Sequence, residues 1–123
     1  MRYELSQKFF FEAAHTLDRD IGTDSSRRIH GHTYHAQVVL SGTPDTTSSM
    51  IVDLGVLKEH IETVRDQLDH RFLDEVPDLG PATLENLCAY IYKKLAAVLP
   101  NVVRVGIERP ASGDRCQLIC HPG

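Results

Sequence analysis

A set of three histidines contains the residues of this chain best suited to chemistry. They are His15, His30 and His32, and the last two form the run His30-Gly31-His32. If the residues from 30 onward form a β-strand, His30 and His32 point to the same face, with Cβ atoms about 7 Å apart. Two such imidazoles can converge on one ion, and a third closes a triangle of nitrogen ligands. Three protein ligands leave one coordination position open, which is typical of catalytic zinc.

The strand phases place all three histidines on apolar faces. His15 shares its phase with Phe9, Phe11 and Ala13, and the His30/His32 pair shares its phase with Tyr34, Ala36, Val38 and Leu40. A single buried histidine is usually a satisfied core residue, whereas three in phase favour a shared metal. Imidazole ligands indicate zinc, and iron, cobalt and nickel remain alternatives.

The composition argues against nucleic-acid and membrane functions. The net charge is −4 and the basic residues are scattered, without the basic stripe of a nucleic-acid footprint. No apolar run approaches the roughly 18 residues of a membrane helix, and charges at Glu4, Lys8 and Glu12 argue against a signal peptide. The three cysteines, Cys88, Cys116 and Cys120, lack metal-site spacing and indicate reduced thiols in a cytoplasmic protein.

The hydrophobic pattern predicts four strands and two helices. Alternation indicates strands over residues 2–15 and 30–41, joined by a polar loop at 16–29. Asp53 and Thr83 are expected to cap two amphipathic helices, and Pro100 ends the second. Two further strands follow, joined by a hairpin at 110–114. The apolar positions of these last four elements are Leu54, Leu57, Ile61, Val64 and Leu68; Leu84, Leu87, Ile91, Leu95 and Val98; Val103, Val105 and Ile107; and Cys116, Leu118 and Cys120.

This order, ββααββ, predicts one α+β domain over residues 1–123. Its four strands form an antiparallel sheet with two helices on one face. The other face and both sheet edges would be open in a monomer. Since proteins close exposed edges by pairing or covering them, we expect self-association through the sheet.

Several other polar residues have both a functional and an ordinary interpretation. His70, preceded by Asp69, is suited to proton transfer, but a histidine after a helix more often only interacts with the helix dipole. Glu108 lies out of phase with the apolar residues of its strand, and its carboxylate could hold an amino-amide ring edge or simply be solvated. Arg27 and Arg28 could meet an anionic substrate or belong to an ordinary loop.

Taken together, these residues resemble the 6-pyruvoyl-tetrahydropterin synthase and 6-carboxy-tetrahydropterin synthase family. Each matching piece is weak alone, whereas their order and spacing are specific. The pieces are Phe11-Glu12-Ala13-Ala14-His15, His30-Gly31-His32-Thr33-Tyr34, Met50-Ile51-Val52-Asp53-Leu54, Leu57-Lys58, Leu68-Asp69-His70-Arg71-Phe72-Leu73, Thr83-Leu84-Glu85-Asn86-Leu87 and Glu108.

The resemblance implies the tunnelling fold, in which three subunits join their sheets into a barrel and two trimers stack as a hexamer. It implies zinc on His15, His30 and His32, and pockets at subunit boundaries. It also implies that Glu108 anchors the pterin ring, with Thr83 and Glu85 near the pocket. The implied substrates are 7,8-dihydroneopterin triphosphate and related dihydropterins.

The implied mechanism departs from the family pattern at one position. The family uses zinc as a Lewis acid on the substrate hydroxyls, a thiolate base, and a proton relay like Asp69 and His70. The thiolate lies four residues before the first histidine of the pair, and here Ser26 occupies that position. A serine hydroxyl is a far weaker base than a thiolate. Asp24 could substitute for it.

Three hypotheses follow for function. The first is a zinc-dependent lyase of the 6-carboxy-tetrahydropterin synthase type, in a 7-deazapurine (queuosine) or pterin pathway, with His70, Asp69 and Ser26 at the catalytic positions. The second is a sister aldolase that gives 6-hydroxymethyl-dihydropterin. The third is a non-catalytic pterin-binding protein. The intact residues Asp69, His70 and Glu108 favour an enzyme. Ser26 favours a binding protein or a changed reaction.

Overall fold

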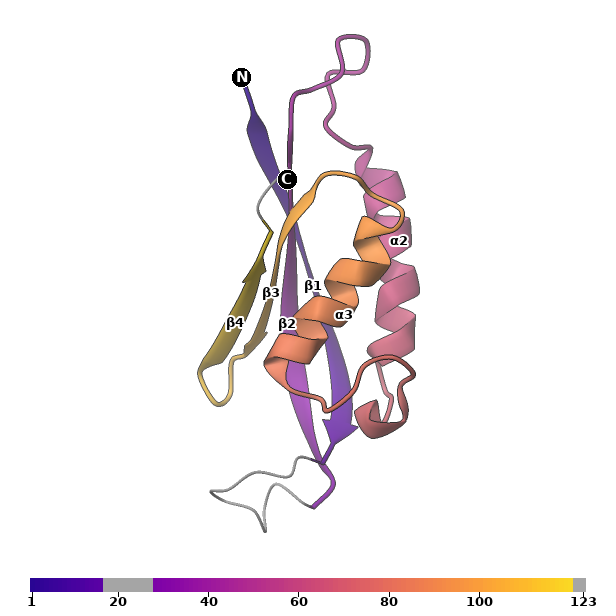
Figure 1. Ribbon diagram of the computed structural model, residues 1–123, viewed down its shortest axis with the longest axis vertical. Coiled ribbons are helices and arrows are strands. Elements are labelled where there is room, and N and C mark those ends of the chain that lie inside the picture. The colour runs from indigo at the N-terminus through magenta and orange to yellow at the C-terminus, as the bar shows by residue number, and fades with distance from the viewer. Residues whose placement is uncertain (17–27, 121–123) are drawn as a thin grey trace.

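The computed structural model describes residues 1–16 and 28–120, and it contains the four-stranded antiparallel sheet that the sequence predicts. The strands are hydrogen-bonded in the order β1-β2-β3-β4, so β1 and β4 form the two edges (Figure 1). Their bounds are β1 Tyr3–His15, β2 His30–Gly42, β3 Val102–Arg109 and β4 Asp114–Ile119.

The register of the first two strands determines where the histidines meet. β1 and β2 pair without interruption from Tyr3↔Gly42 to His15↔His30. Ala13 lies opposite His32 in the same ladder. Side chains of directly opposed residues share a face, so all three histidines gather at one end of this strand pair. That end is the lower one in Figure 1.

Two helices cover one face of the sheet, as predicted (Figure 1). They are α2, Leu54–Leu68, and α3, Leu84–Ala96, and a short 3-10 turn, η1, Leu73–Glu75, lies between them. The Asp53 carboxylate accepts from the backbone N–H groups of Gly55 and Val56, and the Thr83 hydroxyl accepts from that of Asn86. Both residues are therefore the N-caps that the sequence predicts.

Most apolar residues of the two helical stripes form the core. The first residue of one predicted stripe and the last residue of the other do not. The middle positions of both stripes are buried, while Leu54 and Val98 are 44% and 51% exposed. Leu54 stands in the first turn of α2, and Val98 lies beyond the end of α3, so neither faces the sheet. The buried stripe residues are Leu57, Ile61, Val64 and Leu68 in α2 and Leu87, Ile91 and Leu95 in α3.

The third strand differs from its predicted phase at its start. Val105 and Ile107 are buried as expected, but Val102 is buried in place of Val103. The cause is a shift of register between Val39 and Leu40, which pairs Leu40 with Val102. Such an irregularity moves the following residue to the other face, and strict alternation cannot predict it.

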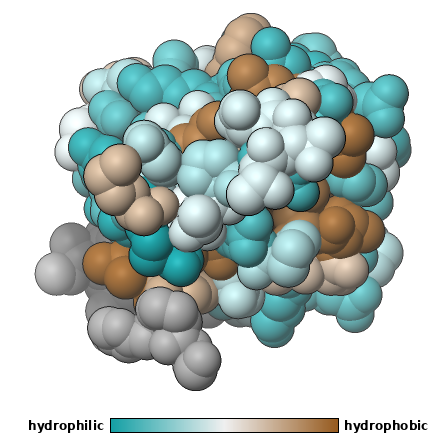
Figure 2. All heavy atoms as spheres, turned by 90° about the horizontal axis from the view of Figure 1, so that it is seen from above, coloured by the Kyte–Doolittle hydropathy of each residue, from teal (hydrophilic) through white to brown (hydrophobic). Residues whose placement is uncertain are grey.

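The surface carries its apolar groups in separate places. Seen from above, hydrophobic atoms lie in distinct groups among hydrophilic ones (Figure 2). Large exposed apolar side chains of the described residues include Met50, Leu54, Val56 and Val98. Within residues 1–16 and 28–120, neither α2 nor α3 has the length and apolar character needed to cross a membrane.

Candidate metal centre

The three histidines form a compact cluster. Their ring centroids are 4.5 Å apart for His15 and His30, 5.0 Å for His15 and His32, and 4.9 Å for His30 and His32. One nitrogen from each ring lies within 4.8 Å of those of the other two. His15 is almost fully buried, and the other two are half-buried. This spacing and exposure are those of a three-histidine metal site with one open side.

Hydrogen bonds to the backbone orient two of the three rings. His15 Nδ1 lies 3.1 Å from the carbonyl oxygen of Ala82, and His30 Nδ1 lies 2.8 Å from that of Arg28. A carbonyl can only accept, so each Nδ1 carries the proton and each Nε2 keeps its lone pair. Metal-bound histidines commonly donate their second nitrogen in this way.

Two ligand nitrogens are left without a partner. His15 Nε2 and His32 Nε2 are buried and make no hydrogen bond to the described residues. A buried polar atom without a partner costs free energy, and native proteins rarely leave one unexplained. A metal ion in the centre of the cluster would satisfy both atoms, so the residues present fit the zinc that the family resemblance implies.

The electrostatics favour the uncharged form of two of the three imidazoles. Burial, together with the neighbouring His30, lowers the pKa of His15. Burial is also the main cause for His32, followed by the positive charge of Arg109, and its pKa falls to about 4. Both imidazoles are therefore neutral at neutral pH, and neutral imidazole is the form that binds metal ions.

Contacts distant in sequence fix the position of His15. The residue after it, Thr16, donates both its backbone N–H and its hydroxyl to the carboxylate of Asp74 in η1. The Ala82 carbonyl that orients His15 directly precedes the N-cap of α3. The metal ligand thus rests on η1 and on the start of α3 as well as on its own strand.

Asp69 and His70 form a carboxylate–imidazole pair beside β1. His70 Nδ1 lies 3.0 Å from Asp69 Oδ2, and Asp69 also accepts from Arg65 Nη2 at 3.2 Å. The backbone N–H of Glu12 donates to Asp69 Oδ1 at 2.9 Å and is the main reason that the pKa of Asp69 is lowered. His70 occupies the left-handed region with φ of 57°. These bonds go beyond the helix-dipole interpretation, because a defined carboxylate orients the ring.

His70 lies at the surface near the metal cluster. Its backbone N–H donates to Glu12, and the next residue, Arg71, accepts from Ala14, so this segment runs along β1. The His70 side chain is 78% exposed. It lines a hollow of about 520 Å³ together with His32 and Phe72. A molecule in this hollow can therefore contact both the proposed proton shuttle and one metal ligand.

The predicted ring-binding residues divide between two places. Thr83 directly follows Ala82 and so lies beside His15, and Glu85 is exposed in the first turn of α3. Glu108 pairs with His35 on one side and Arg115 on the other. Because its neighbour Ile107 is buried against the helices, Glu108 lies on the open face of the sheet. One protomer does not bring Glu108 to the histidines' face.

The predicted residues of the loop lie largely outside the described residues. Ser26, Asp24 and Arg27 fall in the segment 17–27. Arg28 is described and exposed, and its backbone carbonyl, rather than its guanidinium, contributes to the site through His30.

Arg109 is a component of the site that the sequence analysis missed. It ends β3 in the same phase as the buried Val105 and Ile107, and its positive charge acts on His15, His32 and Tyr34. Continuing the apolar phase of β3 by two residues would have placed it on the histidines' face.

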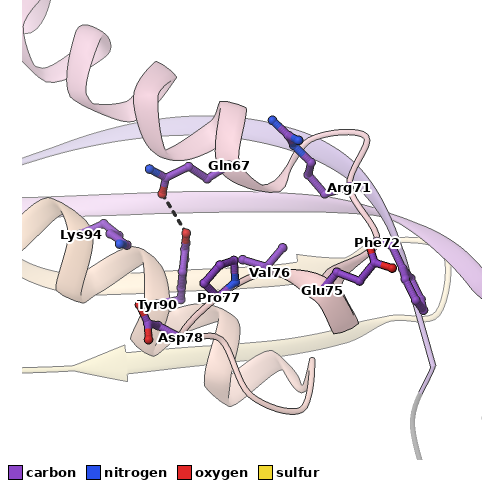
Figure 3. Close-up of a pocket in the computed structure, with 9 residues that line it drawn as sticks. All are labelled: Gln67, Arg71, Phe72, Glu75, Val76, Pro77, Asp78, Tyr90 and Lys94. Carbon is purple, nitrogen blue, oxygen red and sulfur yellow. Dashed lines mark hydrogen bonds between the residues drawn. The ribbon is translucent and has the colours of Figure 1, made fainter.

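A second cavity lies away from the metal cluster. It has a volume of about 380 Å³ and lies between the end of α2, η1 and α3 (Figure 3). Tyr90 donates to Gln67 there at 2.8 Å, and Lys94 lies over the Tyr90 ring. Its polar side chains are paired in this way or carry charges of both signs, and the rest of the lining is apolar, so this cavity is a weaker candidate. Its charged residues are Arg71, Glu75, Asp78 and Lys94.

Cys88 is unsuited to replace the absent loop cysteine. Cys88 is buried in α3, and its Sγ lies 3.5 Å from the carbonyl oxygen of Cys116. Burial raises the pKa of Cys88 to about 12, so it is not a thiolate near neutral pH. Cys88 lies in α3, far along the sequence from the predicted loop that contains Ser26.

A known family and two of its named members match most of this chain. The family model described as 6-pyruvoyl tetrahydropterin synthase matches residues 4–117. A Synechocystis sp. protein named 6-carboxy-5,6,7,8-tetrahydropterin synthase is 35% identical over 94 residues, which cover 72% of this chain and 71% of that protein. A Caenorhabditis elegans protein named putative 6-pyruvoyl tetrahydrobiopterin synthase is 35% identical over 104 residues, or 74% of each chain.

A solved structure agrees with the fold. The structure of Caenorhabditis elegans 6-pyruvoyl tetrahydropterin synthase superposes with a TM-score of 0.82 and 28% identity. The match covers 98% of this chain and 97% of that one. The sheet, its ββααββ order and the two covering helices are therefore shared with a named synthase.

Proposed function

Because this chain belongs to the 6-pyruvoyl tetrahydropterin synthase family, we propose that it is a zinc-dependent lyase of the 6-carboxy-tetrahydropterin synthase type. The proposed substrate is 7,8-dihydroneopterin triphosphate or a related dihydropterin. The proposed setting is a cytoplasmic 7-deazapurine (queuosine) or pterin pathway. The observation that carries the proposal is the cluster of three histidines, in which two buried Nε2 atoms have no partner among the described residues.

The metal ligands in this proposal are His15, His30 and His32. The carbonyls of Ala82 and Arg28 hold the Nδ1 protons of the first two and so direct their Nε2 lone pairs. A zinc ion bound there supplies Lewis acidity, which makes protons on and beside the substrate's side-chain hydroxyls removable.

His70 is the proposed proton shuttle, and Asp69 its orienting partner. The Asp69 carboxylate accepts a hydrogen bond from the N–H of His70 Nδ1, which leaves Nε2 free to take a proton from the substrate. The exposure of His70 and its place in the hollow with His32 support this role. The Asp69 carboxylate also stabilises the imidazolium that forms when the ring accepts a proton.

The proposed ring anchor is Glu108, with Thr83 and Glu85 beside the pocket. Since Glu108 lies on the open sheet face, we propose that the anchor for one metal centre comes from a neighbouring protomer. A trimer, or a dimer of trimers, joined through the sheet edges would supply it.

Mixed oligomers test this arrangement. Glu108→Gln and His32→Ala protomers, each inactive alone, should regain part of the activity when mixed and reassociated. Light scattering during chromatography gives the oligomeric state. A stable, active monomer would contradict the shared site.

Ser26 keeps two other functions open. An aldolase that gives 6-hydroxymethyl-dihydropterin would use a different base, and a pterin-binding protein would need none. A Ser26→Cys variant separates these from the first proposal. If synthase activity appears only in that variant, the natural chain is a binder or has another reaction.

Product analysis tests the proposed function directly. Zinc-loaded protein is incubated with 7,8-dihydroneopterin triphosphate, and the products are identified by mass spectrometry. A carboxy- or pyruvoyl-tetrahydropterin supports the synthase, whereas a hydroxymethyl pterin supports the aldolase. Binding without turnover would overturn the enzymatic proposal for this substrate.

A further inference from the structure

Four buried side-chain atoms of the described residues have no hydrogen-bond partner, and two of them are not explained by a metal. Those two are the Tyr34 hydroxyl oxygen and Arg109 Nε; the other two are His15 Nε2 and His32 Nε2. Tyr34 follows His32 by two positions on β2, and the two ring centroids are 5.6 Å apart. The unexplained pair therefore continues the row of polar groups that begins with the metal ligands.

Arg109 is held in place from one side. Its Nη2 donates to Asp114 Oδ2 at 2.8 Å, and the Ser112 hydroxyl donates to the same oxygen at 2.8 Å. The Arg109 side chain is 21% exposed, so part of its guanidinium remains accessible although Nε is buried. The ion pair restricts the long side chain and leaves other N–H donors of the guanidinium for a ligand.

The position of this cation is unusual for a metal site. Glu108 pairs with His35 in the antiparallel β2–β3 ladder, so the next residue, Arg109, comes level with Tyr34, and its phase with the buried Ile107 puts it on the histidines' face. A fixed positive charge disfavours a second cation nearby. Retaining it beside a metal centre is physically useful when the ligand of that centre is an anion.

We propose that Arg109 is the anion-selecting residue of this site: its guanidinium, held by Asp114 beside the histidine cluster, binds an anionic oxygen of the ligand. Guanidinium groups bind carboxylate and phosphate oxygens through paired, charge-assisted hydrogen bonds. The inference rests on the proposed function, in which both chemistries occur: phosphate in the substrate and carboxylate in the product. The binding experiment below distinguishes these two sources.

The first measurement uses zinc alone. Zinc affinity is determined by competition with a chelator for wild type, Arg109→Gln, Arg109→Lys and Arg104→Gln. Arg104 is a matched control, because it lies on the same strand and pairs with Glu4 rather than with the site. Arg109→Gln should bind zinc several-fold more tightly because a repulsive charge is removed. The other two variants should resemble wild type.

The second measurement uses anions. Inorganic triphosphate and pyruvate are titrated separately into the zinc-loaded proteins by calorimetry. Arg109→Gln should bind the selected anion on the order of tenfold more weakly, and Arg109→Lys, which keeps the charge but not the paired donors, should fall between Arg109→Gln and wild type. A loss confined to triphosphate identifies a phosphate subsite, and a loss confined to pyruvate identifies a carboxylate subsite.

In Arg109→Gln, zinc affinity should rise while anion affinity falls. This combination distinguishes an electrostatic role of Arg109 from a purely structural one. If Arg109 only supports the fold, Arg109→Gln weakens zinc and anion binding together, which overturns the proposal. Unchanged anion affinity also overturns it. Should Arg109→Gln fold poorly, Asp114→Asn removes the counter-charge instead and should weaken zinc binding while strengthening anion binding. Because neither titration contains a pterin, a failure of the proposed reaction leaves this test readable.

Discussion

The histidine cluster and the Asp69–His70 pair contrast in how their polar atoms are satisfied. At the cluster, His15 is buried, and two ring nitrogens have no partner among the described residues. At the pair, one carboxylate oxygen of Asp69 accepts a hydrogen bond from Glu12 and the other contacts Arg65 and His70. The side chain of His70 is 78% exposed. The first region leaves two buried nitrogens for a ligand such as the proposed metal ion, whereas the second has its carboxylate satisfied and its imidazole open to solvent.

This difference reflects two ways of building a site. The cluster lies on the β1–β2 pair, where a continuous register brings the three histidines to one end of the ladder, and contacts from Ala82 and Arg28 orient two of the rings. The pair lies just after α2, where backbone hydrogen bonds to β1 hold a residue with positive φ. Paired strands therefore carry the proposed metal ligands, and a shorter, exposed segment carries the proposed proton shuttle.

The largest expected effect comes from removing a metal ligand. His32→Ala should lose its zinc, because losing a direct ligand costs more than the roughly 10- to 100-fold in affinity that outer partners contribute. His35→Ala is the matched control: His35 lies on the same strand in the opposite phase. Elemental analysis after dialysis measures the effect. Full zinc retention in His32→Ala would show that the cluster is not the metal site.

Removing the carboxylate of the pair should lower activity without affecting the metal. Asp69→Asn keeps an oxygen for the Glu12 N–H but no longer stabilises a protonated His70. We expect kcat to fall on the order of 10²-fold or more, with unchanged zinc content. Asp66→Asn, on the exposed face of the same helix, serves as the control. Equal rates for both variants would remove Asp69 from the mechanism.

The metal-free protein should lose stability in mild acid. The pKa values of His15 and His32 are lowered in the folded state, that of His32 to about 4. Below the ordinary histidine pKa of about 6.5, the unfolded chain therefore binds protons that the folded chain does not. The free energy of unfolding should fall as the pH drops from about 6.5 toward 4.

Urea unfolding of chelator-treated protein at several pH values checks this dependence. His32→Gln should flatten the pH profile, and His35→Gln should not change it. A wild-type profile that is level across this range would mean that the buried imidazoles do not resist protonation.

The smallest expected effect concerns the helix start that supports His15. Thr83→Ala removes the side-chain cap of α3 and should lower the free energy of unfolding by about 1 kcal/mol. Thr63→Ala, on the exposed surface of α2, should change it by no more than a few tenths of a kcal/mol. Thermal unfolding of both variants compares them. A smaller loss for Thr83→Ala than for Thr63→Ala would contradict the capping role.

The sequence was most informative where structure follows local periodicity. Alternation located the first two strands and hence the histidine cluster, and Asp53 and Thr83 were recognisable caps. The order of elements was sufficient for the fold class, because two amphipathic helices between two strand pairs have few ways to bury their apolar faces.

Features that depend on long-range contacts were not predictable in the same way. The register shift between Val39 and Leu40 puts Val102, rather than Val103, in the core. Periodicity alone does not reveal this shift. Asp74 contacts Thr16 across 58 positions of sequence, and Glu108 proved to lie on the face opposite the histidines. The role of Ser26 stays a prediction, since it lies outside the described residues.

The most direct test is the zinc content and ligand set of the purified protein. Elemental analysis combined with X-ray absorption at the zinc edge should show one zinc per protomer, held by three imidazole nitrogens and one further nitrogen or oxygen ligand, with no sulfur. A zinc-free protein after equilibration with excess zinc, or a spectrum with sulfur ligands, would contradict a metal centre built from His15, His30 and His32.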